Sequence, residues 1–124
     1  MKKIELSYAT LEIREGIIWL IFKEDAELDV KDVKEFTSIC EELSNHKPYL
    51  LISDARVNLS ITSDARKAAA SKEISPLLVA NAVLVNNTAV RLVANFFTSM
   101  NKPHFKYKVF KGEEEALMWL KQYA

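Results

Sequence analysis

The chain has 124 residues, enough for one domain that buries a core without disulfides or metals, and 49% of them are hydrophobic. Seventeen basic residues balance seventeen acidic ones, which argues against a protein whose main partner is nucleic acid or an anionic membrane. The apolar runs are far shorter than the ~20 residues that cross a bilayer, and the sequence starts with charged residues. We therefore expect one soluble, cytoplasmic domain over residues 1–124, with no membrane or nucleic-acid partner.

Residues 8–22 predict an antiparallel hairpin. Apolar and polar side chains alternate over residues 8–14, with Tyr8 on the polar side, as in a half-exposed strand. Glu15-Gly16 forms the turn, and residues 17–22 are apolar on both faces. The second strand should therefore lie deeper in the sheet, and the first should form its edge.

A sheet-covering helix is predicted after Asp29, which can cap its start. Its apolar side chains recur at helical spacing: Val30, Val33, Phe36, Ile39, Cys40 and Leu43. Cys40 is the only cysteine, so an internal disulfide is impossible and a packed core thiol is expected. Pro48 disfavours helical geometry in the residue before it and so marks the return to a strand.

Residues 49–52 form a short apolar run followed by Ser53 and Asp54, which is typical of a central strand buried on both faces. A loop over residues 55–61 should follow it. This loop leads to Thr62, Ser63 and Asp64 at the start of a helix, where unpaired backbone N–H groups attract oxygen atoms and negative charge. Thr62 and Ser63 are therefore a candidate anion site or phosphate acceptor. The competing interpretation is that one of them simply caps the helix.

The helix predicted over residues 63–73 has alanines on its inward side, Ala65, Ala68 and Ala69. Such a helix can lie close to its neighbour, and its small side chains let the backbone of another protein approach. We expect a partner-binding surface made of Asp54, Arg56, Asn58, Ser60, Asp64, Arg66 and Ala68.

Another mostly apolar strand is predicted over residues 77–85, interrupted by Asn81. A helix over residues 89–100, an edge strand over residues 105–110 and a last helix that begins after Gly112 complete the chain. The elements thus follow the order strand, strand, helix, strand, helix, strand, helix, strand, helix. This order predicts an α/β fold with a mixed, mostly parallel five-stranded sheet and about four helices.

Several apolar side chains fit more than one interpretation. Leu92 and Phe96 widen the apolar side of the helix over residues 89–100, so they can form a homodimer patch, line a cavity or pack within the chain. Trp19 is expected in the core but can also line a pocket, together with Phe97 and Trp119.

No arrangement typical of catalysis or metal binding stands out. His46 and His104 each lack a second ligand-type residue at metal spacing. There is no Gly-x-Ser-x-Gly turn, and two glycines are too few for a phosphate-binding glycine loop. Asp54 and Arg56 are expected to pair rather than to catalyse. We therefore predict no catalytic residue, no metal and no cofactor.

The order of elements, with a short loop from the third predicted strand into a helix of small residues, resembles the STAS domain, the anti-sigma-factor antagonist fold typified by SpoIIAA. The resemblance covers essentially the whole chain. Residues 50–56, 95–103 and 110–120 more specifically resemble an uncharacterised bacterial group of SpoIIAA-like proteins.

This resemblance implies a non-enzymatic regulatory module that binds a protein partner. In STAS antagonists the loop before the second helix carries Asp-Ser-Ser-Gly, whose serine is phosphorylated by a partner kinase. Residues 61–64 stand at those four places here and keep two hydroxyls, Thr62 and Ser63, but not the aspartate or the glycine. Some SpoIIAA-like relatives instead resemble carriers, which implies an alternative function: binding of a small apolar ligand or lipid in a cavity between sheet and helices.

Overall fold

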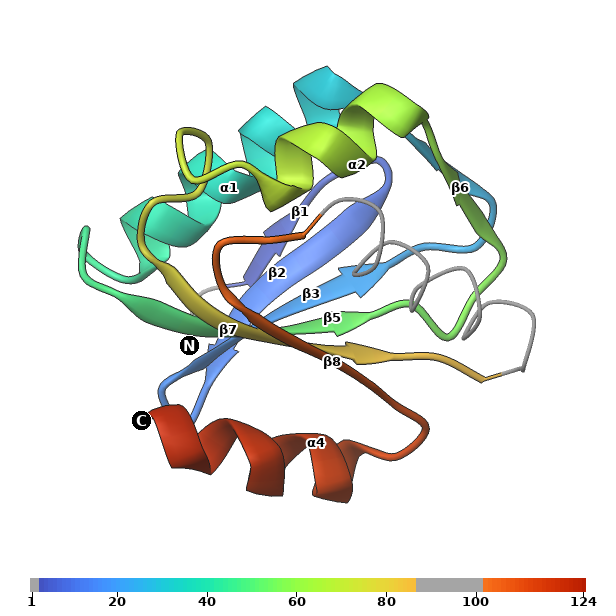
Figure 1. Cartoon of the computed structure of the whole chain (residues 1–124). Helices are drawn as coiled ribbons and strands as arrows, with labels where there is room; N and C mark the ends of the chain where they lie inside the picture. The colour runs from blue at the N-terminus through green and yellow to red at the C-terminus, as the bar shows by residue number, and fades with distance from the viewer. Residues whose placement is uncertain (1–2, 87–101) are drawn as a thin grey trace.

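The computed structural model describes residues 3–86 and 102–124, which form a six-stranded sheet with helices on both sides (Figure 1). Helices α1 and α2 lie on one side of the sheet, and α4 lies on the other. The helices are α1 (Val30–Leu43), α2 (Ser63–Ala70) and α4 (Glu113–Leu120), with a 3-10 turn at Lys121–Tyr123. The strands are β1 (Lys3–Glu5), β2 (Ala9–Arg14), β3 (Ile17–Phe22), β4 (Ala26–Leu28), β5 (Tyr49–Asp54), β6 (Leu59–Ile61), β7 (Leu78–Leu84) and β8 (Lys106–Phe110).

The strands of the main sheet lie in the order β1-β2-β3-β5-β7-β8. Strands β1, β2 and β3 pair antiparallel, whereas β3, β5, β7 and β8 pair parallel. Residues 49–53 of β5 are all buried, because this strand has a neighbour on each side and helices on both faces. The predictions of a mixed α/β sheet and of a central strand that begins at Tyr49 are therefore confirmed.

The predicted number of strands and the predicted edge are wrong. Strand β1 pairs outside β2, so the strand over residues 9–14 is not the edge. Strands β4 and β6 form a separate parallel pair, which we call the β4–β6 ribbon, and β6 occupies part of the expected loop. All three additional strands have three residues, too few to show a periodic pattern, and β4 pairs with a segment far away in the sequence.

The start of α1 is confirmed. The Asp29 carboxylate accepts a hydrogen bond from the Val30 N–H at 2.8 Å, and the Asp32 carboxylate accepts one from the Asp29 N–H at 2.9 Å. Each carboxylate satisfies a backbone donor that the helix itself cannot pair. Cys40 is fully buried on the inner side of α1, as expected for a packed core thiol.

Helix α2 is shorter than the predicted helix over residues 63–73. Ser71 adopts an extended conformation, and its carbonyl accepts hydrogen bonds from the backbone N–H and the hydroxyl of Ser75. This turn satisfies the backbone that a longer helix would have used. The predicted helix over residues 89–100 lies outside the described residues. No helix in the described part of the chain is both long and apolar enough to span a bilayer.

Tyr8 is buried, although its place in the alternation predicted an outward side chain. Its hydroxyl lies 2.9 Å from a carboxylate oxygen of Glu35 and 3.1 Å from the carbonyl oxygen of Asp32, both on α1. The strand begins only at Ala9, so Tyr8 does not follow the alternation of β2. Its polar group is satisfied by the helix, which makes burial of the ring favourable.

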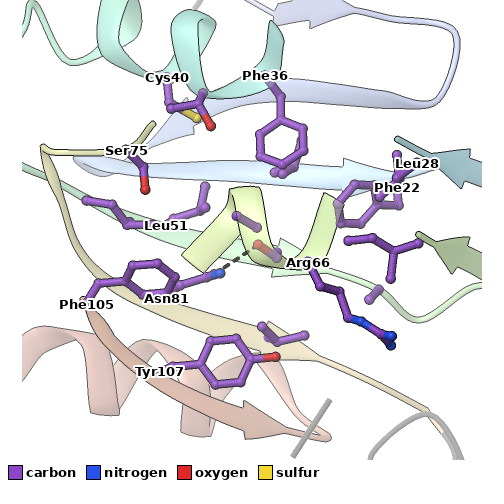
Figure 2. A pocket seen from close by; sticks show the side chains of 18 of the residues that line it. Phe22, Leu28, Phe36, Cys40, Leu51, Arg66, Ser75, Asn81, Phe105 and Tyr107 are labelled. Carbon is purple, nitrogen blue, oxygen red and sulfur yellow. Dashed lines mark hydrogen bonds between the residues drawn. The ribbon is translucent and has the colours of Figure 1, made fainter. Parts of the chain in front are cut away.

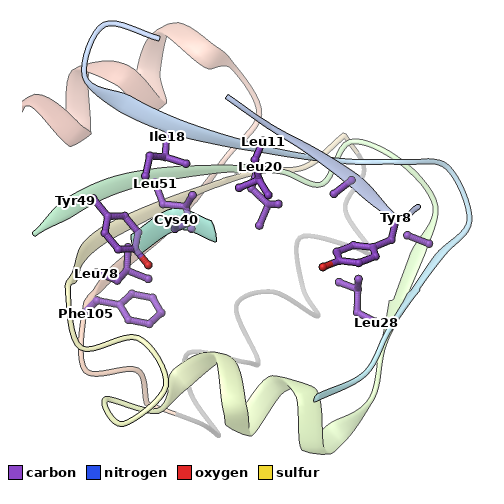
Figure 3. Packing of buried hydrophobic residues seen from close by; sticks show 12 residues of the cluster. Tyr8, Leu11, Ile18, Leu20, Leu28, Cys40, Tyr49, Leu51, Leu78 and Phe105 are labelled. Atoms are coloured by element: carbon purple, nitrogen blue, oxygen red, sulfur yellow. The ribbon is translucent and has the colours of Figure 1, made fainter. Parts of the chain in front are cut away.

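The core has two layers, because alternate strand residues face opposite sides of the sheet. The layer under α4 contains Ile17, Trp19, Leu50, Ile52, Ala80, Ala82, Leu84, Phe110, Ala116 and Leu120. The layer under α1 contains Tyr8, Ala9, Leu11, Ile18, Leu20, Ala26, Leu28, Cys40, Tyr49, Leu51, Leu78 and Phe105. Figure 3 shows Tyr49, Leu78 and Phe105 together at one end of this second layer and Tyr8 and Leu28 at the other.

Candidate functional site

A cavity of about 330 Å³ lies between the sheet and helices α1 and α2 (Figure 2). The strands and helices on that side of the sheet contribute its walls, and most of the described lining is apolar. The apolar lining residues are Leu20, Phe22, Leu28, Phe36, Leu51, Ala55, Leu59, Ile61, Ala69, Leu78, Val83, Val85 and Phe105. Pockets for small organic molecules have volumes of about 300 Å³ or more and mainly apolar walls, so this cavity fits that class.

The alanines of α2 explain why the described residues leave this space unfilled. Ala65 and Ala68 are buried against Val33, so α2 packs on α1 rather than directly on the sheet. Ala69 lines the cavity and contributes only a methyl group. Protein interiors are normally close-packed, which would require a larger side chain at this position. The small side chains of α2 therefore leave a space that the described residues do not fill.

Ser53 on β5 and Asn81 on β7 place a polar pair in the wall that the sheet forms. The Ser53 hydroxyl donates to the side-chain oxygen of Asn81 at 2.9 Å. The side-chain nitrogen of Asn81 makes no hydrogen bond with the described residues, so it offers donors to a molecule in the cavity.

The titratable groups on the inner walls are uncharged at neutral pH. Burial raises the pKa of the Cys40 thiol to about 12. Burial also raises the pKa of the Tyr49 hydroxyl and of the Tyr107 hydroxyl above the usual tyrosine value. Arg66, at the second turn of α2, is the only charged side chain in the described lining, and Figure 2 shows it at the margin of the lining residues.

The candidate phosphate acceptors lie at an exposed corner between β6 and α2. Thr62 caps α2, because its hydroxyl oxygen accepts from the Ala65 N–H at 3.1 Å. The Thr62 hydroxyl also lies 3.3 Å from the Asp29 carboxylate. Ser63 and Asp64 are exposed. The capping role of Thr62 is therefore confirmed, while phosphorylation of Thr62 or Ser63 stays a prediction.

Asp54 and Arg56 pair at the end of β5, as predicted. The guanidinium donates to both oxygens of the Asp54 carboxylate, at 2.9 and 2.8 Å, and also contacts Glu113 at the start of α4 at 2.8 Å. Hydrogen bonds to these two carboxylates raise the pKa of the Arg56 guanidinium above its already high value. A partner at this position would have to compete with contacts inside the chain.

The other residues of the predicted partner surface lie in two places, near the β4–β6 ribbon and on α2. Asn58 and Ser60 lie near the β4–β6 ribbon, where the Asn58 side chain donates to Asp25 at 3.0 Å and Ser60 is exposed. Asp64 and Arg66 lie on α2, where Arg66 turns to the cavity. A partner role for these residues stays a prediction.

Ala68 requires a correction. We expected its small side chain to face a partner, but it is buried between α2 and α1, next to Val33. The apolar side of α2 is used inside the chain, because α1 offers a matching apolar surface. Ala68 is therefore a packing residue and not part of an accessible surface.

The expected cavity lining is also corrected. Trp19 is buried under α4, on the face of the sheet away from the cavity, and Trp119 packs against Phe110 and Tyr123 on that same side. Alternation in the strand shows that Trp19 faces one side but not which side is hollow. Phe97, Leu92 and Phe96 lie outside the described residues, as does the homodimer patch predicted from the last two.

Sequence reasoning missed Asn81 and Tyr107 as lining residues. Asn81 was interpreted only as an interruption of an apolar strand, yet a polar residue on a buried strand indicates a polar neighbour or an internal space. Tyr107 alternates with Lys106 and Lys108 along β8, and alternation alone does not show what its side chain faces.

One serine and histidine lie close together, but their arrangement does not favour catalysis. The Ser75 hydroxyl lies 3.2 Å from the side-chain nitrogen Nε2 of His104 and also donates to the Ser71 carbonyl at 3.2 Å. A hydroxyl has one proton, so in this arrangement the imidazole donates rather than accepts. In the described part of the chain, no three His, Cys, Asp or Glu side chains gather as metal ligands would.

The comparison with solved structures supports the fold. The chain resembles an uncharacterised protein of the DUF3478 family from Shewanella loihica PV-4, described as having a SpoIIAA-like fold. The TM-score is 0.60, and the match covers 90% of this chain and 91% of that one at 16% sequence identity. The predicted STAS or SpoIIAA-like fold is therefore confirmed, and at this identity the likeness concerns the fold alone.

The comparison with protein families identifies the chain more directly. No curated protein matches it. A family model described as a domain of unknown function, DUF7793, matches residues 11–124, which include every described element from β3 to the end of the chain. The chain therefore belongs to the DUF7793 family and has a SpoIIAA-like fold.

Proposed function

We propose that this protein is a non-enzymatic regulatory module of the STAS type, and that it works by binding a small apolar molecule between the sheet and helices α1 and α2. The single observation that supports this proposal is the cavity of about 330 Å³ with mostly apolar described walls. Transfer of apolar surface from water into such a cavity is favourable in proportion to the area buried. A cytoplasmic location is part of the proposal, since the one cysteine, Cys40, is a free thiol.

A binding role agrees with the chemistry of the walls. The polar groups of the sheet wall, on Ser53 and Asn81, can orient a bound molecule by hydrogen bonds. The hydroxyl of Ser75 donates to a backbone carbonyl, so it is not set up as a nucleophile. The arrangement favours retention of a molecule over its conversion.

The experiment places a large side chain in the cavity from α2 and measures whether an apolar probe still binds. The fluorescent apolar probe N-phenyl-1-naphthylamine is titrated into the purified chain, into Ala69→Phe and into the control Ala70→Phe. Ala69 lines the cavity and Ala70, the next residue on α2, does not. We expect the first substitution to abolish probe binding and the control to retain it. Equal binding by all three proteins, or by none, would contradict the proposal.

A second candidate function is recruitment of a protein partner through the corner at Thr62 and Ser63, controlled by phosphorylation. The exposure of this corner favours it. A phosphate on Ser63 would lie at the start of α2, where backbone N–H groups favour negative charge, and Arg66 follows three residues later. Phosphate would therefore be stabilised locally and would change the charge of the surface.

Native mass spectrometry on protein purified from its own host tests this second function. We expect a fraction that carries one phosphate in the unmodified chain and none in the double variant Thr62→Val, Ser63→Ala. Ser60→Ala, which removes an exposed hydroxyl from β6, is the matched control and should keep the phosphate. Absence of phosphate from the unmodified chain would contradict the switch.

A further inference from the structure

Arg66 combines two properties that are rarely found together. Its side chain lines an apolar cavity, and its guanidinium has no hydrogen bond or ion pair with the residues that the structure describes. Side chains three or four positions away on a helix are its nearest neighbours there. Those positions hold Thr62, Ser63, Ala69 and Ala70, so α2 supplies no carboxylate to neutralise it.

The remainder of the described lining carries no compensating charge. Apart from Arg66, it consists of apolar side chains and uncharged polar groups, namely Thr37, Cys40, Tyr49, Ser53, Ser75, Asn81 and Tyr107. Burial keeps the Cys40 thiol and both tyrosine hydroxyls protonated, so none of them becomes an anion near neutral pH. A molecule in this cavity thus meets one positive charge and no negative one from the described walls.

We propose that the ligand is a single-chain amphiphile whose apolar tail fills the cavity and whose oxyanion head group, a carboxylate or a phosphate, pairs with Arg66. This inference rests on the ligand-binding function proposed above and adds the class of ligand. The guanidinium presents a planar pair of donors that matches either head group. A cationic head group would be repelled, and a neutral one would gain no charge-assisted hydrogen bond.

The size of the cavity limits the tail. A water molecule occupies about 30 Å³ in the liquid, and a methylene group is of similar size, so about 330 Å³ holds roughly eleven such groups. A tail of about ten carbons fits this space. Tyr49 and Phe105, which also line the cavity, would then be available to contact the tail.

Isothermal titration calorimetry with decanoate, decyl phosphate and decanol tests the proposal, because these probes share a tail and differ in the head group. The full chain is compared with Arg66→Gln and with Lys67→Gln, which removes the neighbouring exposed charge. Loss of one charge-assisted pair typically weakens binding about tenfold to a hundredfold. We expect the chain to bind decanoate or decyl phosphate at least about tenfold more tightly than decanol. Arg66→Gln should remove that difference without weakening decanol, and Lys67→Gln should keep it.

The outcomes distinguish failure of the anionic head-group assignment from failure of the ligand-binding function itself. Preference for decanoate alone would indicate a carboxylate ligand, and preference for decyl phosphate alone a phosphate ligand. Equal affinity for decanol and the anions, or anion preference that survives in Arg66→Gln, would overturn the inference while an apolar ligand site remained. Binding of neither the amphiphiles nor N-phenyl-1-naphthylamine would overturn the proposed function itself. Circular dichroism melting curves verify that Arg66→Gln is folded.

Discussion

The guanidinium of Arg56 lies 2.8 Å from the carboxylate of Glu113, so it joins the end of β5 to the start of α4. The same guanidinium holds the Asp54 carboxylate at 2.8 Å. Because Asp54 is mostly shielded from water whereas Glu113 is half exposed, the pair with Asp54 is the less screened of the two.

Replacement of Arg56 should therefore destabilise the fold modestly. We expect Arg56→Met to lower the free energy of unfolding by about 1 kcal/mol and Glu113→Gln to lower it by less, because partly exposed ion pairs contribute little. Urea denaturation followed by circular dichroism measures both. The control Lys111→Met, at an exposed position near α4, should leave stability unchanged. A wild-type midpoint for Arg56→Met would show that the contact does not stabilise the chain.

Substitution of Ala68 by glutamate should destabilise the chain strongly. Its side chain is buried against α1, so Ala68→Glu has to bury a charge or separate the two helices. We expect a loss of roughly 2–4 kcal/mol in the free energy of unfolding. Lys67→Glu introduces the same residue one position earlier, at an exposed place, and should cost no more than about 0.5 kcal/mol. Similar unfolding curves for the two variants would argue against the packing of α2 on α1.

His104 should make stability depend on pH. Partial desolvation lowers the pKa of its imidazole in the folded chain, although a hydrogen bond that the imidazole donates to the Ser75 backbone acts in the opposite direction. The unfolded chain therefore binds a proton more readily, at a pKa of about 6.5, and stability falls as the pH drops through that value. We expect the free energy of unfolding to be lower at pH 5.5 than at pH 7.5.

The variant His104→Asn should reduce this difference, measured by urea denaturation at the two pH values. His46→Asn is the matched control, since His46 lies in an exposed turn with positive φ, which asparagine accepts. If His104→Asn leaves the pH dependence as it is, other groups cause it.

Cys40 should be unreactive in the folded chain. Its side chain is fully buried and its thiol has a pKa raised to about 12, whereas alkylation requires an accessible thiolate. We expect iodoacetamide at pH 8 to leave the folded protein unmodified over a period in which urea-unfolded protein is labelled completely. Mass spectrometry of the intact chain measures the difference. Rapid labelling without urea would show that the cavity opens widely enough to admit the reagent to its wall.

The sequence was sufficient for the parts of the fold that rest on local patterns. Strand β5 and helix α1 are signalled by an apolar run and by a helical stripe after a capping aspartate. The β4–β6 ribbon was not predictable in this way, because each strand has three residues and its pairing depends on a distant segment. Local patterns carry no information about that partner.

The candidate site was harder to predict for a related reason. Periodicity shows that Trp19 and Leu20 face opposite sides of the sheet, but not that the side of Leu20 is hollow. The hollow arises from the way α2 packs on α1, a long-range contact between Ala68 and Val33. Arg66 was recognised as a surface residue, and only this packing shows that it borders the cavity.

The β4–β6 ribbon brings cavity-lining side chains and an exposed hydroxyl to adjacent positions of the chain. Leu28 and Ile61, which are opposite each other in the ribbon, both line the cavity. The next residue, Thr62, donates its N–H to the carbonyl of Leu28 at 3.1 Å and carries the first of the two outward hydroxyls. A ligand that displaced the side chain of Leu28 or Ile61 would shift the end of β6, where Thr62 begins the candidate phosphorylation site. Ligand binding and phosphorylation would then be coupled across the single peptide bond between Ile61 and Thr62.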